Sequence, residues 1–323
     1  MRQLWLVIAS IIVVSLGISW RASAESLANY QKQPDIYGNI SSVGSDTLSG
    51  MMTLWVEEFN HLYPGVTIQV QASGSATAPP ALTEGTAQIG PMSRPMRQRE
   101  IDAFVAHYGY KPTQLKVAID AIGIYINRDN PIQGLTISQL DSIYSATLRC
   151  GAKKPITTWS QLGLSYQWAK RSIQLFGRNS ASGTYGYFKD HALCGGDYKS
   201  RVNALPGSSS VIQSVASAIN TIGYSGVGYR SAGVRMLPIA RSGQNFISPT
   251  QQHILSGEYP LSRYLFVYVN KAPDKPLPKL VRQFLLFIYS KQGQSLVDKD
   301  GYVPVSEHIA QAQLAKVGII PKP

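Results

Sequence analysis

The sequence predicts an α/β protein of two lobes, and three observations carry this prediction. From about residue 37 onward, short β-type runs alternate with amphipathic stretches, a pattern typical of α/β architecture with parallel sheets. The chain has 323 residues, 44% of them hydrophobic, and such a length usually exceeds a single core. No linker rich in proline, glycine or serine divides the chain, which indicates that it crosses between the lobes more than once.

The hydrophobic patterns predict individual strands and helices. Strands are expected where short apolar or alternating runs occur, at residues 66–70, 118–126, 173–176 and 265–269. Helices are expected at residues 51–62 and 278–289, because apolar side chains recur there at helical spacing. These apolar stripes are interpreted as core packing.

Residues 1–24 are predicted to be a cleaved secretory signal. Arg2 gives a positive start, residues 4–20 form an apolar run, and residues 22–24 (Ala-Ser-Ala) match the small-x-small cleavage pattern. An uncleaved membrane anchor is the alternative, but the run is short and ends in that tripeptide. Because no cysteine directly follows the run to carry a lipid, we expect the mature protein to be free in the periplasm.

The two cysteines, Cys150 and Cys194, are expected to form a disulfide. Cysteines of an exported chain usually pair, and on the chain-entropy account this bridge would stabilise the fold by roughly 4 kcal/mol. The alternative is a nucleophile or metal site built on His191 and Cys194. It would need further ligands or a base, and the neighbouring sequence offers none.

Charge and composition narrow the possible partners. The net charge of +12 favours anions. Lysines and arginines are scattered singly or in pairs, so no nucleic-acid-binding stripe is expected. The 5 histidines are dispersed without metal-ligand spacing, and no carboxylate cluster suited to two metals is visible. We therefore expect no metal and no cofactor.

Three turns rich in glycine, serine and threonine precede helical stretches, at residues 44–48, 73–80 and 178–184. Each would present backbone N–H groups and hydroxyls at a helix N-terminus, where the helix dipole favours an anion. Taken singly, each turn is explained by ordinary helix capping. The threefold repetition, with Arg178 four residues before Ser182, favours a shared site for a tetrahedral oxyanion over a surface salt bridge of Arg178.

These motifs resemble a known family, the phosphate-binding proteins that serve ABC-type phosphate importers. The resemblance rests on Gly-Ser-x-Thr at 44–47, Ile-Gly-x-x-Ser-Arg at 89–94 and, most diagnostically, Arg-x-x-x-Ser-Gly-Thr at 178–184. Later stretches also look like the family, at residues 223–229, 259–263 and 301–304.

The resemblance implies a type II periplasmic solute-binding protein, in which two α/β lobes joined by hinge crossings hold the ligand in the cleft. Lobe 1 is expected to comprise residues 25–122 and 262–323, and lobe 2 residues 123–261. The implied function is capture of inorganic phosphate and its delivery to the membrane permease of an ABC importer. The protein is expected to be a monomer and not an enzyme.

The family's pattern also implies which residues bind the ligand. The first two turns would supply amides and hydroxyls from one lobe, and the third would close from the other. The expected ligand-binding residues are Asp46, Thr47, Leu48, Ser75, Ser93, Arg94, Asp120, Arg178, Ser182, Gly183 and Thr184.

Arg94 departs from the family's pattern, because better-known members carry an aspartate there that accepts the proton of hydrogen phosphate. Such an acceptor selects against fully deprotonated sulfate. Our hypothesis is that Asp46 or Asp120 replaces it. The alternatives are that Asp46 is a helix N-cap and that Asp120 pairs with Arg94 or Arg178. Arg94 itself is expected either to be a second cation at the anion or to pair with a carboxylate.

Other functions compete with phosphate transport. Receptors for sulfate or molybdate would use a similar cradle. A secreted phosphate-ester hydrolase could hold a transferred phosphoryl group, but it lacks a visible metal or histidine cluster. The 18 tyrosines and the basic surface would also suit an extracellular adhesion protein, although tyrosine in a chain with many strands more often packs in the core.

Overall fold

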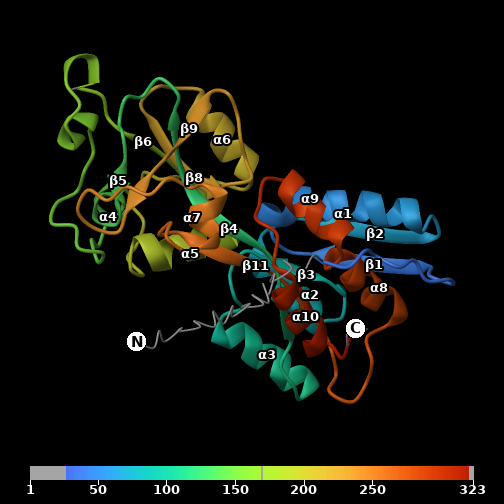
Figure 1. The fold of residues 1–323 in the computed structure, drawn as a ribbon. Coiled ribbons are helices and arrows are strands. Elements are labelled where there is room, and N and C mark those ends of the chain that lie inside the picture. The colour runs from blue at the N-terminus through green and yellow to red at the C-terminus, as the bar shows by residue number, and fades with distance from the viewer. Residues whose placement is uncertain (1–26, 169, 320–323) are drawn as a thin grey trace, which may run out of the picture.

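A computed structural model describes residues 27–168 and 170–319. The signal segment expected at residues 1–24 lies outside this part of the chain. The described residues form two groups of helices and strands that are joined by two strands, β4 and β11 (Figure 1). Each group has its own large hydrophobic core. We call the group around β1 and β2 the first lobe and the group around β6 and β8 the second lobe.

The first lobe begins with two parallel strands, β1 (Gly38–Val43) and β2 (Val66–Gln71). Four helices pack beside them: α1 (Ser49–Leu62), α8 (Lys279–Ile288), α9 (Lys291–Lys299) and α10 (Glu307–Lys316). The apolar stripes of α1 and α8 meet in the core, where the rings of Phe59 and Phe284 lie 5.2 Å apart. The helices predicted at 51–62 and 278–289 are therefore confirmed.

A smaller core lies at the side of the first lobe. It is built by α2 (Ala78–Thr83), β3 (Gly90–Met92) and α3 (Gln98–Tyr108). Phe104 of α3 is completely buried in it. This small core holds β3 against β11, which places the residues after β3 beside the crossing strands.

The second lobe contains most of the central sheet. Its strands are β6 (Gln174–Arg178), β7 (Asn203–Leu205), β8 (Thr221–Gly226) and β9 (Val234–Leu237). Its helices are α4 (Ile137–Tyr144), α5 (Gly183–Ala192), α6 (Ser208–Ala216) and α7 (Gln251–Leu255), and β5 (Leu135–Thr136) pairs with β10 (Ile239–Ala240). Stacked rings of Phe188 and Tyr224, 4.0 Å apart, mark its core. The expected disulfide between Cys150 and Cys194 is present, with a Cα–Cα distance of 5.1 Å.

The long strand β4 (Thr113–Asn127) links the lobes. Its beginning packs in the first core through Leu115 and Val117, and its end packs in the second through Ile124 and Ile126. The chain returns on β11 (Ser262–Val269), which runs antiparallel to β4. The central sheet, in the order β3-β11-β4-β8-β6-β7 with β9 also paired to β4, is therefore mixed.

The expectation of parallel sheets holds for the two small sheets, β1-β2 and β5-β10, and is wrong for the central sheet, which is mixed. β6 is parallel to its neighbours β7 and β8, but β4 is antiparallel to β8, β9 and β11. The double crossing explains the antiparallel pairing of β4 with β11, because β11 returns to the first lobe beside the strand that left it. The four predicted strands are present as β2, β4, β6 and β11, with β4 extending beyond residues 118–126 at both ends.

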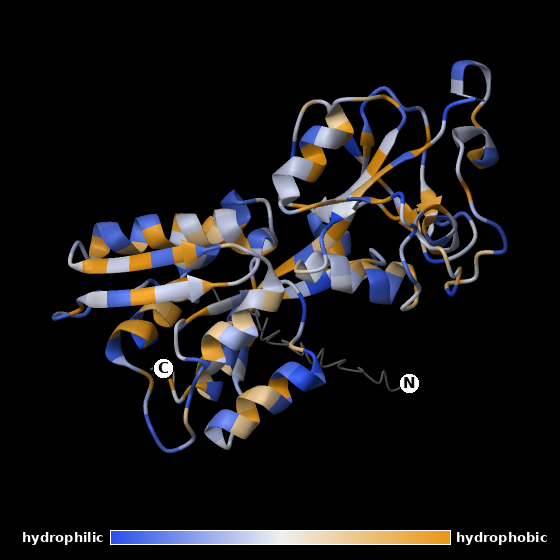
Figure 2. Ribbon diagram, turned by 180° about the vertical axis from the view of Figure 1, so that it is seen from behind, coloured by the Kyte–Doolittle hydropathy of each residue, from blue (hydrophilic) through white to orange (hydrophobic). Residues whose placement is uncertain are grey.

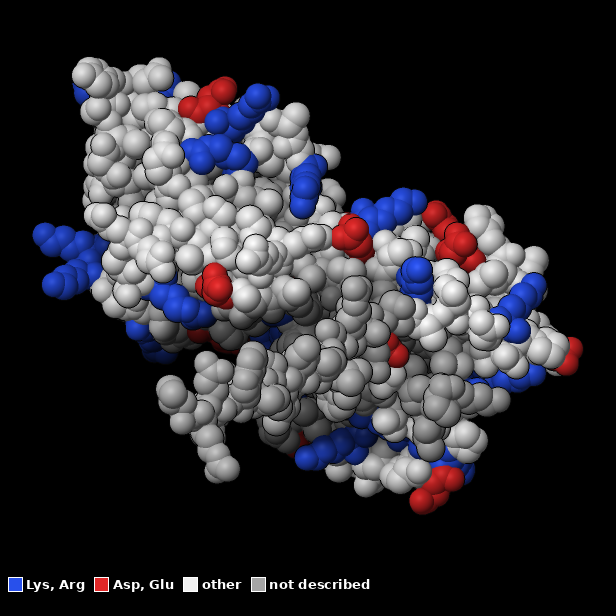
Figure 3. All heavy atoms as spheres, viewed as in Figure 1, with Lys and Arg blue, Asp and Glu red and all other residues white. Residues whose placement is uncertain are grey.

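The distribution of hydrophobic and basic residues agrees with the expectations from the sequence. Hydrophobic residues follow the interior strands and the inner faces of the helices (Figure 2). On the face seen in Figure 3, lysines and arginines are scattered singly or in small groups. Among residues 27–168 and 170–319, none of the helices combines the length and apolar character that a bilayer crossing requires.

Candidate anion-binding site

The first turn lies between β1 and α1 and forms a short 3₁₀ helix, η1 (Asp46–Leu48). Gly44 anchors it, because its N–H donates to the Gln71 carbonyl at 2.9 Å. A Cβ at Gly44 would overlap the Pro91 carbonyl oxygen, so the close approach of these segments requires glycine. Thr47 and Leu48 are buried, and the side chain of Leu48 packs in the first core, so only its backbone faces the turn.

The second turn follows β2 and leads into η2 (Ser75–Thr77). Its Gly74 has a φ of +113°, a conformation that favours glycine. The Oγ of Ser75 accepts a hydrogen bond from the Ser93 N–H at 3.0 Å and lies 3.3 Å from the Ser93 Oγ. The Ala76 N–H donates to the Ala181 carbonyl at 3.0 Å, so this turn contacts the third turn directly.

The third turn connects β6 to α5, and Ser182 is the N-cap of that helix. The Ser182 Oγ accepts from the Thr184 N–H at 3.1 Å. A Cβ at Gly183 would lie 2.5 Å from the Ser93 Oγ and would also overlap the Ser75 Oγ. The Thr184 Oγ1 is 2.9 Å from the Thr47 Oγ1. The start of α5 therefore lies against both turns of the first lobe.

Arg178 ends β6 and is only 1% exposed. Its Nη1 donates to the Ser208 Oγ at 2.6 Å and its Nη2 to the Pro206 carbonyl at 2.8 Å. Its buried Nε makes no hydrogen bond to any described residue. Burial lowers the pKa of Arg178, and the nearby Asp46 carboxylate opposes this effect. The surface salt bridge considered as an alternative for Arg178 is therefore wrong.

Asp46 contacts the second lobe and is not the N-cap of its own helix, since Ser45 occupies that position. Its Oδ2 accepts hydrogen bonds from the backbone N–H of Ser208 at 2.9 Å and from the Ser208 Oγ at 2.8 Å. The same oxygen lies 3.1 Å from the Arg178 Nη1. Asp46 thus links η1 to Arg178 and to the first residue of α6.

Asp120 lies on β4 and pairs with Arg263, not with Arg94 or Arg178. Its Oδ2 accepts from the Arg263 Nε at 2.9 Å and Nη2 at 2.7 Å, and its Oδ1 accepts from the Val227 N–H at 3.2 Å. Burial raises the pKa of Asp120, while the Arg263 guanidinium opposes this rise. The carboxylate therefore neutralises a buried cation of the crossing strands.

Arg263 is a site residue that sequence reasoning missed. It donates from Nη1 to the Ser93 carbonyl at 2.9 Å and from Nη2 to the Thr184 Oγ1 at 2.9 Å, so it contacts both lobes. The only signal in the sequence was its place in the family-like stretch at residues 259–263. Its position opposite Asp120 depends on the antiparallel register of β4 and β11, which the sequence pattern did not predict.

Arg94 is held by a carboxylate. Its Nη1 and Nη2 donate to the two oxygens of Glu100 at 2.8 and 2.7 Å, and its Nη1 also donates to the Pro95 carbonyl. The Arg94 guanidinium lowers the pKa of Glu100, although partial burial of that carboxyl acts the other way. Of the two expectations for Arg94, pairing with a carboxylate is the one observed.

The cluster brings hydroxyls, amides and a guanidinium together at the junction of the lobes. Thr47, Ser75, Ser93 and Thr184 are all nearly or completely buried and hydrogen-bond in pairs. Each hydroxyl can turn its proton toward an anion, and the N-terminus of α5 adds a favourable dipole. A site with such donors, and with an Arg178 Nε–H that has no hydrogen-bond partner among the described residues, suits a small oxyanion.

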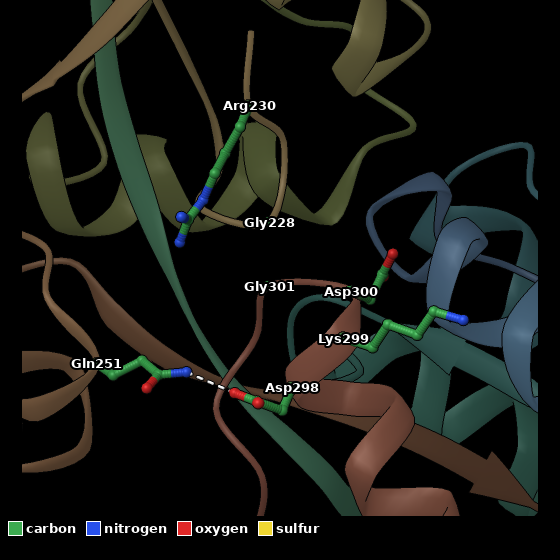
Figure 4. A pocket seen from close by; sticks show the side chains of 7 residues that line it. All are labelled: Gly228, Arg230, Gln251, Asp298, Lys299, Asp300 and Gly301. Carbon is green, nitrogen blue, oxygen red and sulfur yellow. Dashed lines mark hydrogen bonds between the residues drawn. The ribbon is translucent and has the colours of Figure 1, made fainter.

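A cavity of about 540 Å³ lies beside this cluster, also between the lobes. It is lined by Gly228, Arg230, Gln251, Asp298, Lys299, Asp300 and Gly301. Figure 4 shows the Gln251 amide and the Asp298 carboxylate pointing toward one another, and their hydrogen bond is 2.7 Å long. Since both side chains are exposed, this contact joins the lobes at the surface, outside the buried cluster.

Comparison with known proteins identifies the family. A family model for the PBP superfamily domain matches residues 29–292. The phosphate-binding protein PstS of Pseudomonas aeruginosa is 52% identical over 316 residues, which cover 96% of this chain and 98% of that protein. The chain belongs to the PBP superfamily and, within it, to the PstS family.

Other members extend this relationship. PstS of Staphylococcus epidermidis is 27% identical over 286 residues, covering 87% of this chain and 83% of that protein. A substrate-binding protein of Clostridium perfringens, solved with bound phosphate, superposes with a TM-score of 0.70 at 25% identity, covering 83% of this chain and all of that one. The resemblance drawn from the motifs and the two-lobed α/β fold are thereby confirmed.

Proposed function

We propose that this protein captures inorganic phosphate between its two lobes and delivers it to an ABC importer. The observation that carries the proposal is the convergence of three hydroxyl-rich turns and two buried arginines, Arg178 and Arg263, at the junction of the lobes. The relatives bear the name phosphate-binding protein PstS, and one solved relative holds phosphate. The protein is a binding protein and not an enzyme.

The proposed ligand-binding groups come from both lobes. From the first lobe, phosphate would be bound by Thr47, the amide of Leu48, Ser75 and Ser93. From the second lobe, it would be bound by Arg178, Ser182, Gly183 and Thr184. The proposed division remains residues 25–122 with 262–323 for lobe 1 and 123–261 for lobe 2. The two large hydrophobic cores support this division.

For the proton acceptor we favour Asp46 over Asp120. Both oxygens of Asp120 are occupied by Arg263 and the Val227 amide. The Oδ1 of Asp46 accepts no hydrogen bond from the described residues, and its side chain is 20% exposed. Asp46 therefore has an oxygen that can accept the proton of hydrogen phosphate. Because Glu100 pairs with the Arg94 guanidinium, we do not propose Arg94 as a direct ligand of the anion.

Isothermal calorimetry with phosphate, sulfate and molybdate tests the function. We expect one phosphate per chain and much weaker binding of sulfate, because sulfate lacks a proton for the Asp46 acceptor. Asp46→Asn should reduce the ratio of phosphate affinity to sulfate affinity by about tenfold or more, since it removes a charged hydrogen-bond partner of the phosphate proton. Asp120→Asn serves as the comparison. An equal preference for sulfate in the wild type would contradict the proposal.

We also propose that the mature protein acts in the periplasm as a monomer and docks on a membrane permease. The N-terminal signal pattern and the disulfide support an exported protein. Hydrolysis of a chromogenic phosphate ester by the purified protein would favour the hydrolase alternative, and we expect none.

A further inference from the structure

We infer that Asp46 is an inter-lobe latch, a positioning residue that holds the receptor closed around its anion. This inference rests on the proposed function and extends it to the release of the ligand. The latch consists of the Asp46 carboxylate in the first lobe and a socket in the second lobe, formed by Arg178 and Ser208.

The socket is built within the second lobe without help from Asp46. The Ser208 Oγ and the Pro206 carbonyl hold the guanidinium of Arg178. Ser208 is also the first residue of α6, a helix of nine residues, so its N–H points out of the helix N-terminus. A guanidinium and a helix N-terminus together attract a carboxylate.

Asp46 fills this socket from the opposite lobe. One oxygen, Oδ2, receives the Ser208 N–H, the Ser208 hydroxyl and the Arg178 Nη1, all within 3.1 Å. Its backbone carbonyl accepts a further hydrogen bond from the Tyr229 hydroxyl, also of the second lobe, at 2.9 Å. Opening the cleft would break all of these bonds at once.

The latch is coupled to the anion through Arg178. The guanidinium that pairs with Asp46 also carries the buried Nε, which has no hydrogen-bond partner within residues 27–168 and 170–319. Thr47, next to Asp46, contacts Thr184 at the start of α5. Closing the lobes therefore seats Asp46 and assembles the hydroxyl cluster in one movement. The latch raises affinity by raising the closed fraction, an effect that appears mainly in the dissociation rate.

This role differs in its signature from that of a proton acceptor. A latch slows the release of phosphate and sulfate alike, whereas an acceptor changes their ratio. A purely electrostatic competitor for Arg178 would have the opposite effect, because its removal would strengthen anion binding. Kinetics with two anions therefore separate the two roles proposed for Asp46: faster release common to phosphate and sulfate reports the latch, and a further loss confined to phosphate reports the acceptor.

The test is stopped-flow measurement of phosphate and sulfate binding to the wild type, Asp46→Asn and Ser208→Ala. We expect phosphate to dissociate about tenfold to hundredfold faster from Asp46→Asn, with the association rate within about threefold of wild type. Ser208→Ala should release both anions faster by a common factor, because it weakens the socket and leaves every carboxylate in place. The double variant should resemble Asp46→Asn alone, since both changes break one interaction.

Asp298→Asn is the matched control, because Asp298 also bonds across the lobes, but at an exposed position. Its rates should stay within about twofold of wild type. Small-angle scattering in saturating phosphate should detect a larger open fraction only for the latch variants. An equal acceleration in Asp298→Asn, unchanged release from Asp46→Asn, or tighter binding by it would overturn the latch. If the wild type itself binds no phosphate, the proposed function fails instead.

Discussion

At the scale of single residues, the site depends on how each charge is paired. Each of three buried arginines is neutralised by a different carboxylate: Arg178 by Asp46, Arg263 by Asp120 and Arg94 by Glu100. Sequence motifs indicated that Arg178 and Asp46 belong to anion-binding turns. They could not reveal the partners, because Ser208 and Arg263 come from distant segments whose positions depend on sheet register. The residue types were thus predictable and the pairing was not.

The partly buried carboxyl group of Asp300 gives a prediction of how the stability of the protein depends on pH. Its carboxylate lies at the N-terminus of α1 beside Gly50, and burial raises its pKa to about 6 despite a hydrogen bond from the Met51 amide. The folded state therefore binds a proton more readily than the unfolded state, so this residue's contribution to stability falls as the pH rises from about 4 to about 6.

We expect Asp300→Asn to gain stability relative to wild type over this pH range and to keep that gain at pH 7. Urea unfolding at pH 4.5 and pH 7 measures the difference between the two proteins. Asp274→Asn, which changes an exposed loop carboxylate, is the control. A difference that does not grow with pH would show that Asp300 is not protonated preferentially in the fold.

At the scale of elements, the turns and their helices were predicted well because capping and glycine signals are local. The strands at 66–70 and 173–176 and the helix at 51–62 appear where the apolar patterns placed them. The direction of the strands was not predicted, because alternation along a strand does not reveal its neighbour. Arg263 was missed for this reason, since only the antiparallel pairing of β11 with β4 brings it into the cluster.

The approach of α5 to the opposite lobe can be tested at Gly183. Gly183→Ala should prevent full closure, because its Cβ would overlap the hydroxyls of Ser75 and Ser93. We expect phosphate affinity to fall by about tenfold or more in calorimetry, the equivalent of about 1.4 kcal/mol. Gly186→Ala, on the same helix, is the matched control, since its Cβ would meet its nearest neighbour, Arg94, at 3.4 Å. Equal losses in both variants would point to α5 as a whole and not to closure.

At the scale of the whole molecule, two cores share the strands that connect them. The sequence suggested two lobes with repeated crossings because its length exceeds one core and no linker divides it. The structure adds that β4 contributes side chains to both cores and that Arg263, on β11, contacts both halves of the site. The site is therefore hydrogen-bonded directly to one of the strands that cross between the lobes.

Closure around an anion should stabilise the whole protein. If only the folded state binds phosphate, its unfolding free energy should increase by about 1.4 kcal/mol for each tenfold rise in phosphate above the dissociation constant. Thermal unfolding across a phosphate series measures this increase, and sodium chloride at matched ionic strength controls for general salt effects. A melting temperature that responds equally to both salts would exclude a specific site.

The sharing of β4 also limits how this protein can change by recombination. A crossover between related genes at the point where the strand leaves one lobe would join half of β4 to a foreign partner. Its remaining residues would then have to match the pairing of β8, β9 and β11 as well as the packing of both interiors. The lobes are therefore expected to be inherited as one unit, even though each has an interior of its own.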